Sequence, residues 1–177
     1  MTETLAPSRT TVGVRPYRPA DHGACRRLWA ELTEQHSELY EDPSLTSPDP
    51  GAAFEEYLTR LDLSGMWVAE DRGEGVVGFA GLILAGRSGE VDPVIVARHR
   101  RSQGIGRMLL EHVADQARRR NLKELHISPA LRNVEAIHCL HAAGYDQLAR
   151  VTLTFDLSGR RGDWRDDLTL HDKRFRY

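Results

Sequence analysis

Residues 90–120 of the chain read EVDPVIVARHRRSQGIGRMLLEHVADQARRR. An apolar strand pattern comes first, a basic turn with Gly104 and Gly106 follows, and the rest has the spacing of an amphipathic helix. The first amides of a helix lack internal acceptors, and the helix dipole adds partial positive charge there. Glycines let a ligand approach the backbone, and the turn also carries four arginines: Arg98, Arg100, Arg101 and Arg107. The stretch therefore predicts a site for a phosphate-bearing ligand.

Outward from this stretch, the remaining sequence alternates between strand-like and helix-like apolar spacing. The periodicities predict strands at 12–17, 66–70, 76–85, 90–96, 123–128 and 151–157, and helices at 20–40, 52–61, 105–120 and 133–143. Three prolines predict a loop at 41–51, and one more short strand is expected near Leu168–Leu170. The element order indicates an α/β protein with a mixed sheet flanked by helices.

Length and composition indicate one globular domain over 1–177, with a flexible start at 1–10 and a C-terminal extension at 158–177. The 24 basic and 26 acidic residues nearly cancel, so global charge does not favour nucleic acid or a membrane surface as a partner. Two cysteines in helical patterns suit reduced thiols. No apolar run approaches the ~20 residues that span a bilayer, so we expect a cytoplasmic protein.

The glycine spacing discriminates among phosphate-binding motifs. A P-loop is excluded because no Gly-Lys-Ser/Thr follows, and a dinucleotide fingerprint lacks its third glycine. What remains is the pattern Arg-x-x-Gly-x-Gly at 101–106, directly behind the strand Val94-Ile95-Val96.

With this pattern the sequence resembles the GNAT superfamily of acetyl-CoA-dependent N-acetyltransferases. The resemblance covers roughly residues 12–157 and is most specific at 90–110. It implies a mostly antiparallel mixed sheet of about six or seven strands with about four helices, and acetyl-CoA as cosubstrate. It further implies that Val94, Ile95 and Val96 offer backbone groups to the pantetheine arm. By the same resemblance, the residues around the pyrophosphate are Arg101, Ser102, Gln103, Gly104, Ile105, Gly106 and Arg107.

A second matching region reads NVEAIHCLHAAGY, residues 133–145. In the family the asparagine usually contacts the cofactor, which makes Asn133 a candidate, although asparagine also favours helix starts for its own sake. Seven residues further on, many members have a tyrosine that protonates the departing thiolate. This chain has Leu140 there, so the usual general acid is missing.

Acyl transfer to an alkyl amine benefits from a base, because such amines are mostly protonated at neutral pH. Glu90 and Asp92 lie two apart on the strand and therefore point to the same face. By resemblance, Glu90 occupies the place of the glutamate base of the histone acetyltransferase branch, and Asp92 lies nearer the reacting centre. We expect Asp92, ahead of Glu90, to be the base. The alternative is a pair of solvated acids or partners of local arginines.

The sequence therefore predicts an acyltransferase that moves an acetyl group to a primary amine, with a small molecule favoured over a protein or peptide amine. The alternative is an acyl-CoA-binding regulatory module with weak or no catalysis. No metal is expected, because His138 and His141 lack a third ligand at suitable spacing. Binding of nucleic acid is the weakest hypothesis, and homodimerisation through the tail at 164–177 is left open.

Overall fold

The computed structural model describes residues 12–155, 157, 164–165 and 167–177. The chain divides into two compact units, Met1–Ser128 and Pro129–Tyr177. The segment predicted to be flexible, 1–10, lies outside the described residues, as do 158–163 of the predicted extension. The single domain over 1–177 stays a prediction.

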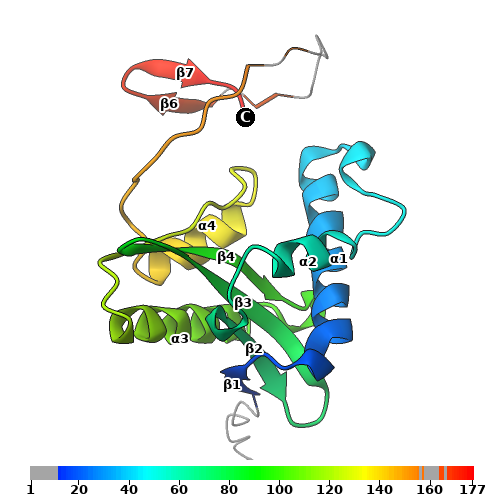
Figure 1. The fold of residues 1–177 in the computed structure, drawn as a ribbon. Coiled ribbons are helices and arrows are strands. Elements are labelled where there is room, and N and C mark those ends of the chain that lie inside the picture. Colours follow the sequence, from blue (N-terminus) through cyan, green and yellow to red (C-terminus); the bar gives the residue numbers. More distant parts are fainter. Residues whose placement is uncertain (1–11, 156, 158–163, 166) are drawn as a thin grey trace, which may run out of the picture. The chain divides into compact units, whose positions relative to one another are not determined.

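A five-stranded sheet forms the centre of the first unit (Figure 1). Its strands, in spatial order, are β1 (Val12–Pro16), β2 (Met66–Asp71), β3 (Gly75–Ala85), β4 (Ser88–Val96) and β5 (Glu124–His126). All neighbours are antiparallel except β4 and β5, which run parallel. The chain is thus an α/β protein with a mixed, mostly antiparallel sheet, and the predicted fold class is confirmed. Five of the predicted strands form this sheet, and the one expected near Leu168–Leu170 pairs in a separate hairpin with a strand that was not predicted.

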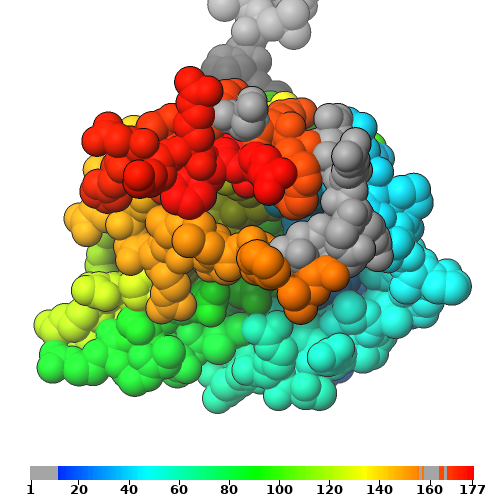
Figure 2. All heavy atoms as spheres, turned by 90° about the horizontal axis from the view of Figure 1, so that it is seen from above, coloured from blue at the N-terminus to red at the C-terminus, as the bar shows by residue number. Residues whose placement is uncertain are grey.

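Three helices belong to the first unit: α1 (His22–Tyr40), α2 (Ala53–Leu58) and α3 (Ile105–Arg119). The helices α1 and α2 cover one face of the sheet and α3 covers the other (Figure 1). The helix α2 is shorter than the predicted 52–61. Single turns of 3-10 helix lie at Pro19–Asp21, Pro43–Leu45, Leu63–Gly65 and Arg98–Arg100. The predicted loop at 41–51 is mostly exposed and forms part of the surface drawn in cyan in Figure 2.

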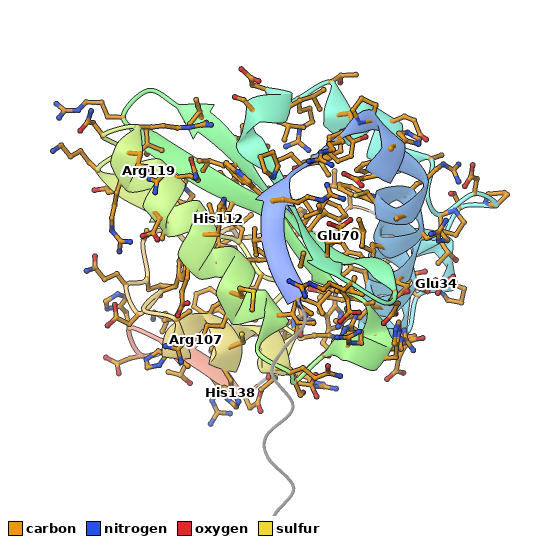
Figure 3. All side chains as sticks on the ribbon, turned by 90° about the horizontal axis from the view of Figure 1, so that it is seen from below. Glu34, Glu70, Arg107, His112, Arg119 and His138 are labelled. Carbon is orange, nitrogen blue, oxygen red and sulfur yellow. The ribbon has the colours of Figure 1, made fainter. Side chains whose placement is uncertain are left out.

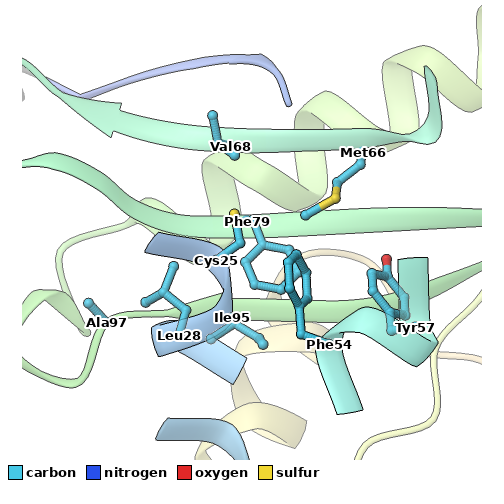
Figure 4. Close-up of a cluster of buried hydrophobic side chains, with 9 residues drawn as sticks. All are labelled: Cys25, Leu28, Phe54, Tyr57, Met66, Val68, Phe79, Ile95 and Ala97. Atoms are coloured by element: carbon cyan, nitrogen blue, oxygen red, sulfur yellow. The ribbon is translucent and has the colours of Figure 1, made fainter. Parts of the chain in front are cut away.

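An aromatic core fills the space between the sheet and the helices α1 and α2. Trp29 and Phe54 lie 5.9 Å apart between ring centroids, and Trp29 stacks on Phe79 at 6.5 Å. The buried members of this core, drawn in Figure 4, are Cys25, Leu28, Phe54, Tyr57, Met66, Val68, Phe79, Ile95 and Ala97. Each large side chain buried here contributes roughly 1.5–3 kcal/mol, so this face anchors α1 and α2 firmly.

The opposite face of the sheet packs against α3 through the apolar stripe that the sequence predicted. Ile105, Leu109, Val113 and Ala117 are buried, whereas Met108 is only partly buried. Figure 3 shows this helix from below, with Arg107 in its first turn and Arg119 in its last.

The second unit contains α4 (Val134–Ala142) and a hairpin of β6 (Leu168–Leu170) and β7 (Lys173–Phe175). The helix ends before Gly144, whose φ of 96° matches the predicted left-handed cap. The expected strand at 151–157 is wrong. Its described residues Val151 to Phe155 pair with no other strand of the described chain, and Phe155 is 85% exposed. Alternation gives a segment two faces but does not supply the neighbouring strand that its backbone needs.

Candidate active site

The turn between β4 and α3 is held by two left-handed residues, Ser102 with φ 60° and Gly104 with φ 82°. Gly104 is the N-cap of α3, and no side chain caps the first turn. A Cβ at Gly104 would meet nothing within 4 Å, so the φ angle alone requires glycine there. A Cβ at Gly106 would touch Val96 Cγ2 at an ordinary 3.7 Å. Neither packing nor φ explains glycine at 106, whereas a ligand lying against the helix start would.

The arginines of the turn divide into two kinds. Arg98 donates to both carboxylate oxygens of Glu38, each at 3.0 Å, and Arg100 pairs with Glu74 at 2.6 Å and Asp71 at 3.1 Å. Both therefore link the turn to the rest of the first unit, Arg100 through a largely buried pair with Asp71 and Arg98 through an exposed pair with Glu38.

Arg101 and Arg107 were the two arginines predicted to bind the cofactor. The Nε of Arg101 donates to the Val96 carbonyl at 3.1 Å, and among the described residues no carboxylate lies within ion-pair distance of it. Arg107 pairs with Glu111 at 2.7 Å, and both side chains are well exposed, as in the Arg98–Glu38 pair, so both pairs are weak. Arg101 is therefore the arginine of the turn best suited to an incoming phosphate.

Next to the turn, β4 presents an open edge. Within the described chain, β5 pairs only with residues 88–90 of β4. The Ala97 N–H donates to Val77 at 2.8 Å, and Gly78 lies opposite Val96. Since bonded and non-bonded pairs alternate in an antiparallel ladder, Val96 and Val94 turn their N–H and C=O groups away from β3, toward the edge that β5 leaves open.

Ile95, the third strand residue predicted to face the cofactor, lies opposite Phe79 and uses its backbone groups in the ladder with β3. Its side chain is part of the aromatic core. The open edge is therefore provided by Val94 and Val96.

A β-bulge interrupts β4 just before this edge. On β3 one residue, Gly81, lies between Ala80 and Leu82, whereas on β4 Asp92 and Pro93 lie between their partners. A bulge bends its strand and redirects a side chain. The bulge was not predicted from the sequence, although glycines inside an apolar strand pattern, here Gly78 and Gly81, can mark one.

Asp92 lies on the face of the sheet that α2 covers. Its Oδ2 is 3.5 Å from Nη2 of Arg60, which follows α2. Glu90 lies opposite Ile83, a residue packed against the aromatic core, so both predicted acids share this face. Burial raises the pKa of Asp92 above its ordinary value; Arg60 opposes this rise and Glu90 adds to it. A carboxylate with a raised pKa is a stronger base than a solvated one.

Asn133, a predicted cofactor contact, and Leu140 lie in the second unit. Asn133 is the N-cap of α4, and its Oδ1 accepts a hydrogen bond from the Ala136 N–H at 3.1 Å, so Asn133 caps the helix as asparagine commonly does. Its contact with a cofactor stays a prediction. Leu140 is 7% exposed and carries no group that could donate a proton.

The comparisons with known proteins decide the family. Residues 23–145 match the family model described as Acetyltransferase (GNAT) family. The chain belongs to this family. GNAT proteins transfer acetyl groups from acetyl-CoA, so the predicted family and the acetyl-transfer class are confirmed. No curated relative matches this GNAT protein.

Solved structures share its fold. A ribosomal-protein-alanine N-acetyltransferase of Brucella melitensis is 26% identical, with a TM-score of 0.59 over 74% of this chain and 82% of that one. A tetramutant of the BH1408 protein of Bacillus halodurans is 18% identical, with a TM-score of 0.69 over 81% and 99%. The N-acetylglutamate synthase of Neisseria gonorrhoeae, crystallised with coenzyme A and N-acetyl-glutamate, is 19% identical, with a TM-score of 0.57 over 75% and 28%.

The described residues of this GNAT protein contain no group of three His, Cys, Asp or Glu side chains arranged to hold a metal ion. Among the described helices, none combines the length and apolar character needed to cross a bilayer.

Proposed function

We propose that this GNAT protein transfers the acetyl group of acetyl-CoA to a primary amine that attacks the thioester directly, with Asp92 as the base and Glu90 supporting it. One observation carries the proposal. The bulge that places Asp92 immediately precedes the open edge formed by Val94 and Val96. The acid and the backbone edge are thus adjacent on a single strand.

The cofactor side of the site consists of the turn and the edge. The amides of Ile105 and Gly106, at the uncapped start of α3, suit a pyrophosphate, and Arg101 adds charge beside them. The N–H and C=O groups of Val94 suit an amide-containing arm that lies along the strand. Ser102, Gln103 and Arg107 complete this side, and Asn133 stays a predicted cofactor contact that rests on the family resemblance alone.

The chemical step assigned to the chain's own residues is the removal of a proton from the acceptor amine. Acetyl-CoA supplies the activated acyl group, and a thiol with a pKa of about 8.5 leaves far more easily than an alkoxide. The acceptor amine must lose a proton to become nucleophilic, and Asp92 takes it. Burial raises the pKa of Asp92, which makes its carboxylate a stronger base than a solvated one.

Leu140 favours a second candidate, an acyl-CoA-binding module with weak or no catalysis. A well-placed general acid is typically worth about 10²- to 10⁴-fold, and the leucine supplies none. The ease of thiolate departure argues that turnover survives without that acid.

The acceptor is a primary amine, with a small molecule favoured over a protein or peptide amine. The Brucella relative acts on a ribosomal-protein alanine, so N-terminal peptides belong in the test set. The experiment is a screen of small amines and N-terminal peptides for acetyl-CoA-dependent thiol release, together with calorimetry of acetyl-CoA binding. Binding with turnover supports the transferase, binding without turnover supports the module, and no binding at high micromolar cofactor contradicts both.

A further inference from the structure

Arg60 is the cation that faces the proposed base. Its main-chain N–H donates to the carbonyl oxygen of Tyr57 at 2.9 Å, directly after α2. Leu58 and Leu61, on either side of it in the chain, both pack against the aromatic core. These contacts hold the main chain of Arg60 in place, while its side chain, which is 55% exposed, reaches Asp92. The fold therefore presents one positive charge, open to solvent, beside the base.

Most of the hydrogen-bonding capacity of Arg60 is unused. Its Nη2 lies 3.5 Å from Oδ2 of Asp92, longer than an N–H···O hydrogen bond of about 2.7–3.2 Å. Among the described residues, its guanidinium donates no hydrogen bond and forms no other ion pair. An exposed pair at this distance adds little to stability, so stability does not explain an arginine here. A guanidinium presents several N–H donors in one plane and can bind both oxygens of a carboxylate. Arg60 is therefore available to an anionic group of a ligand.

The charges around Asp92 match a zwitterion. Glu90 lies on the same face of the sheet and acts on Asp92 as a like charge, whereas Arg60 acts on it as the opposite charge. An ammonium group complements the two carboxylates, and a carboxylate on the same molecule complements the guanidinium. In an α-amino acid both groups are attached to one carbon atom. That proximity suits Asp92 and Arg60, which are themselves neighbours.

We propose that Arg60 binds the carboxylate of the acceptor, and that the acceptor is therefore a free α-amino acid. The inference rests on the proposed function, because it takes Asp92 as the base. The amino nitrogen forms a bond to the acetyl carbon, the C–S bond of the thioester breaks, the sulfur keeps its electron pair, and the amine proton goes to Asp92. Protonated Asp92 no longer balances the charge of Arg60, whereas the carboxylate of the bound amino acid does. The products are an N-acetyl amino acid and coenzyme A.

The test measures kcat and KM for thiol release from acetyl-CoA with pairs of acceptors, each pair being a standard amino acid and its α-carboxamide. The amide keeps the amine and the side chain but lacks the negative charge. The quantity compared among variants is the ratio of kcat/KM for the amino acid to kcat/KM for its amide. A change in Arg60 that acts only through Asp92 alters both acceptors by a similar factor and leaves this ratio unchanged.

Three variants are compared with the wild type. Arg60→Gln should lower the ratio by about 10- to 100-fold, mainly by raising KM for the amino acid, because it removes hydrogen bonds between charged groups. Arg60→Lys keeps the charge without the planar fork and should retain part of the preference. Arg118→Gln removes an exposed arginine paired with Asp115 and should leave the ratio at its wild-type value. The melting temperatures should stay close to that of the wild type, since both pairs are exposed.

Two results would overturn the inference, and they are distinguishable. If the wild type acetylates amines but Arg60→Gln keeps the wild-type ratio, Arg60 does not bind the acceptor's carboxylate, and the proposed function stands. If the wild type releases no thiol with any amino acid, amide or other amine, the proposed function is overturned and the role of Arg60 with it.

Discussion

The guanidinium of Arg101 donates through Nε to the main-chain oxygen of Val96, 3.1 Å away. This bond ties the basic turn to the open edge of β4, so one arginine supports both parts of the proposed cofactor site. Arg101→Ala should therefore weaken acetyl-CoA binding by tenfold or more, since a charge-assisted hydrogen bond is worth about 1.5–3 kcal/mol. Calorimetry measures it. Arg118→Ala, which removes an exposed arginine paired with Asp115 in the last turn of α3, is the control, and equal affinity in the two variants would contradict the assignment.

Gly106 is a position where one substitution should change folding stability and ligand binding in opposite directions. Alanine fits there without a clash, and a helical glycine costs up to about 1 kcal/mol relative to alanine. Gly106→Ala should therefore raise the melting temperature while weakening acetyl-CoA binding. Gly23→Ala is the matched control, because Gly23 is likewise the second residue of its helix and a Cβ there meets only Arg27, at 3.8 Å. It should stabilise the protein without changing affinity. A Gly106→Ala variant that binds acetyl-CoA as well as Gly23→Ala does would show that the glycine serves no ligand.

Much of the fold follows from periodicity in the sequence. The helix α3 has its predicted stripe because apolar residues at a helical spacing must face a core, and β3 is central because it is apolar on both faces. The segment 151–157 shows the limit of this reasoning. Its alternation is regular, yet whether it becomes a strand depends on a partner that the local pattern does not specify.

The ion pair between Asp21 and Arg15 of β1 predicts how the stability of the protein depends on pH. Asp21 is 7% exposed and accepts two hydrogen bonds from Arg15, at 2.7 and 2.9 Å, which lower the pKa of its carboxyl. A lowered folded-state pKa contributes stability above the ordinary carboxyl pKa and loses it as the pH falls through the folded value. Asp21→Asn should thus cost about 1–3 kcal/mol at neutral pH and progressively less in acid.

Urea unfolding of wild type and Asp21→Asn from pH 7 down into the acid range measures this difference. Asp115→Asn is the control, because Asp115 forms an exposed pair with Arg118 and should stay within about 0.5 kcal/mol of wild type. A difference between wild type and Asp21→Asn that is constant over the whole range would contradict the role given to the lowered pKa.

The candidate site was only partly predictable. Gly104 and Arg101 follow from a short motif, because a turn before a helix needs a left-handed residue and a pyrophosphate needs charge. The sequence did not predict that Arg98 and Arg100 bind carboxylates instead. Their partners Glu38 and Glu74 come from other elements of the fold.

The central claim is that Asp92 takes the proton of an amine that attacks acetyl-CoA. The most direct test is the rate of amine-dependent thiol release by wild type and Asp92→Asn, with acetyl-CoA affinity measured alongside. Asp92→Asn should bind acetyl-CoA like wild type and react about 10²- to 10⁴-fold more slowly. The wild-type rate should fall as the pH drops through the raised pKa of Asp92. An Asp92→Asn variant that reacts at the wild-type rate with unchanged pH dependence would contradict the claim.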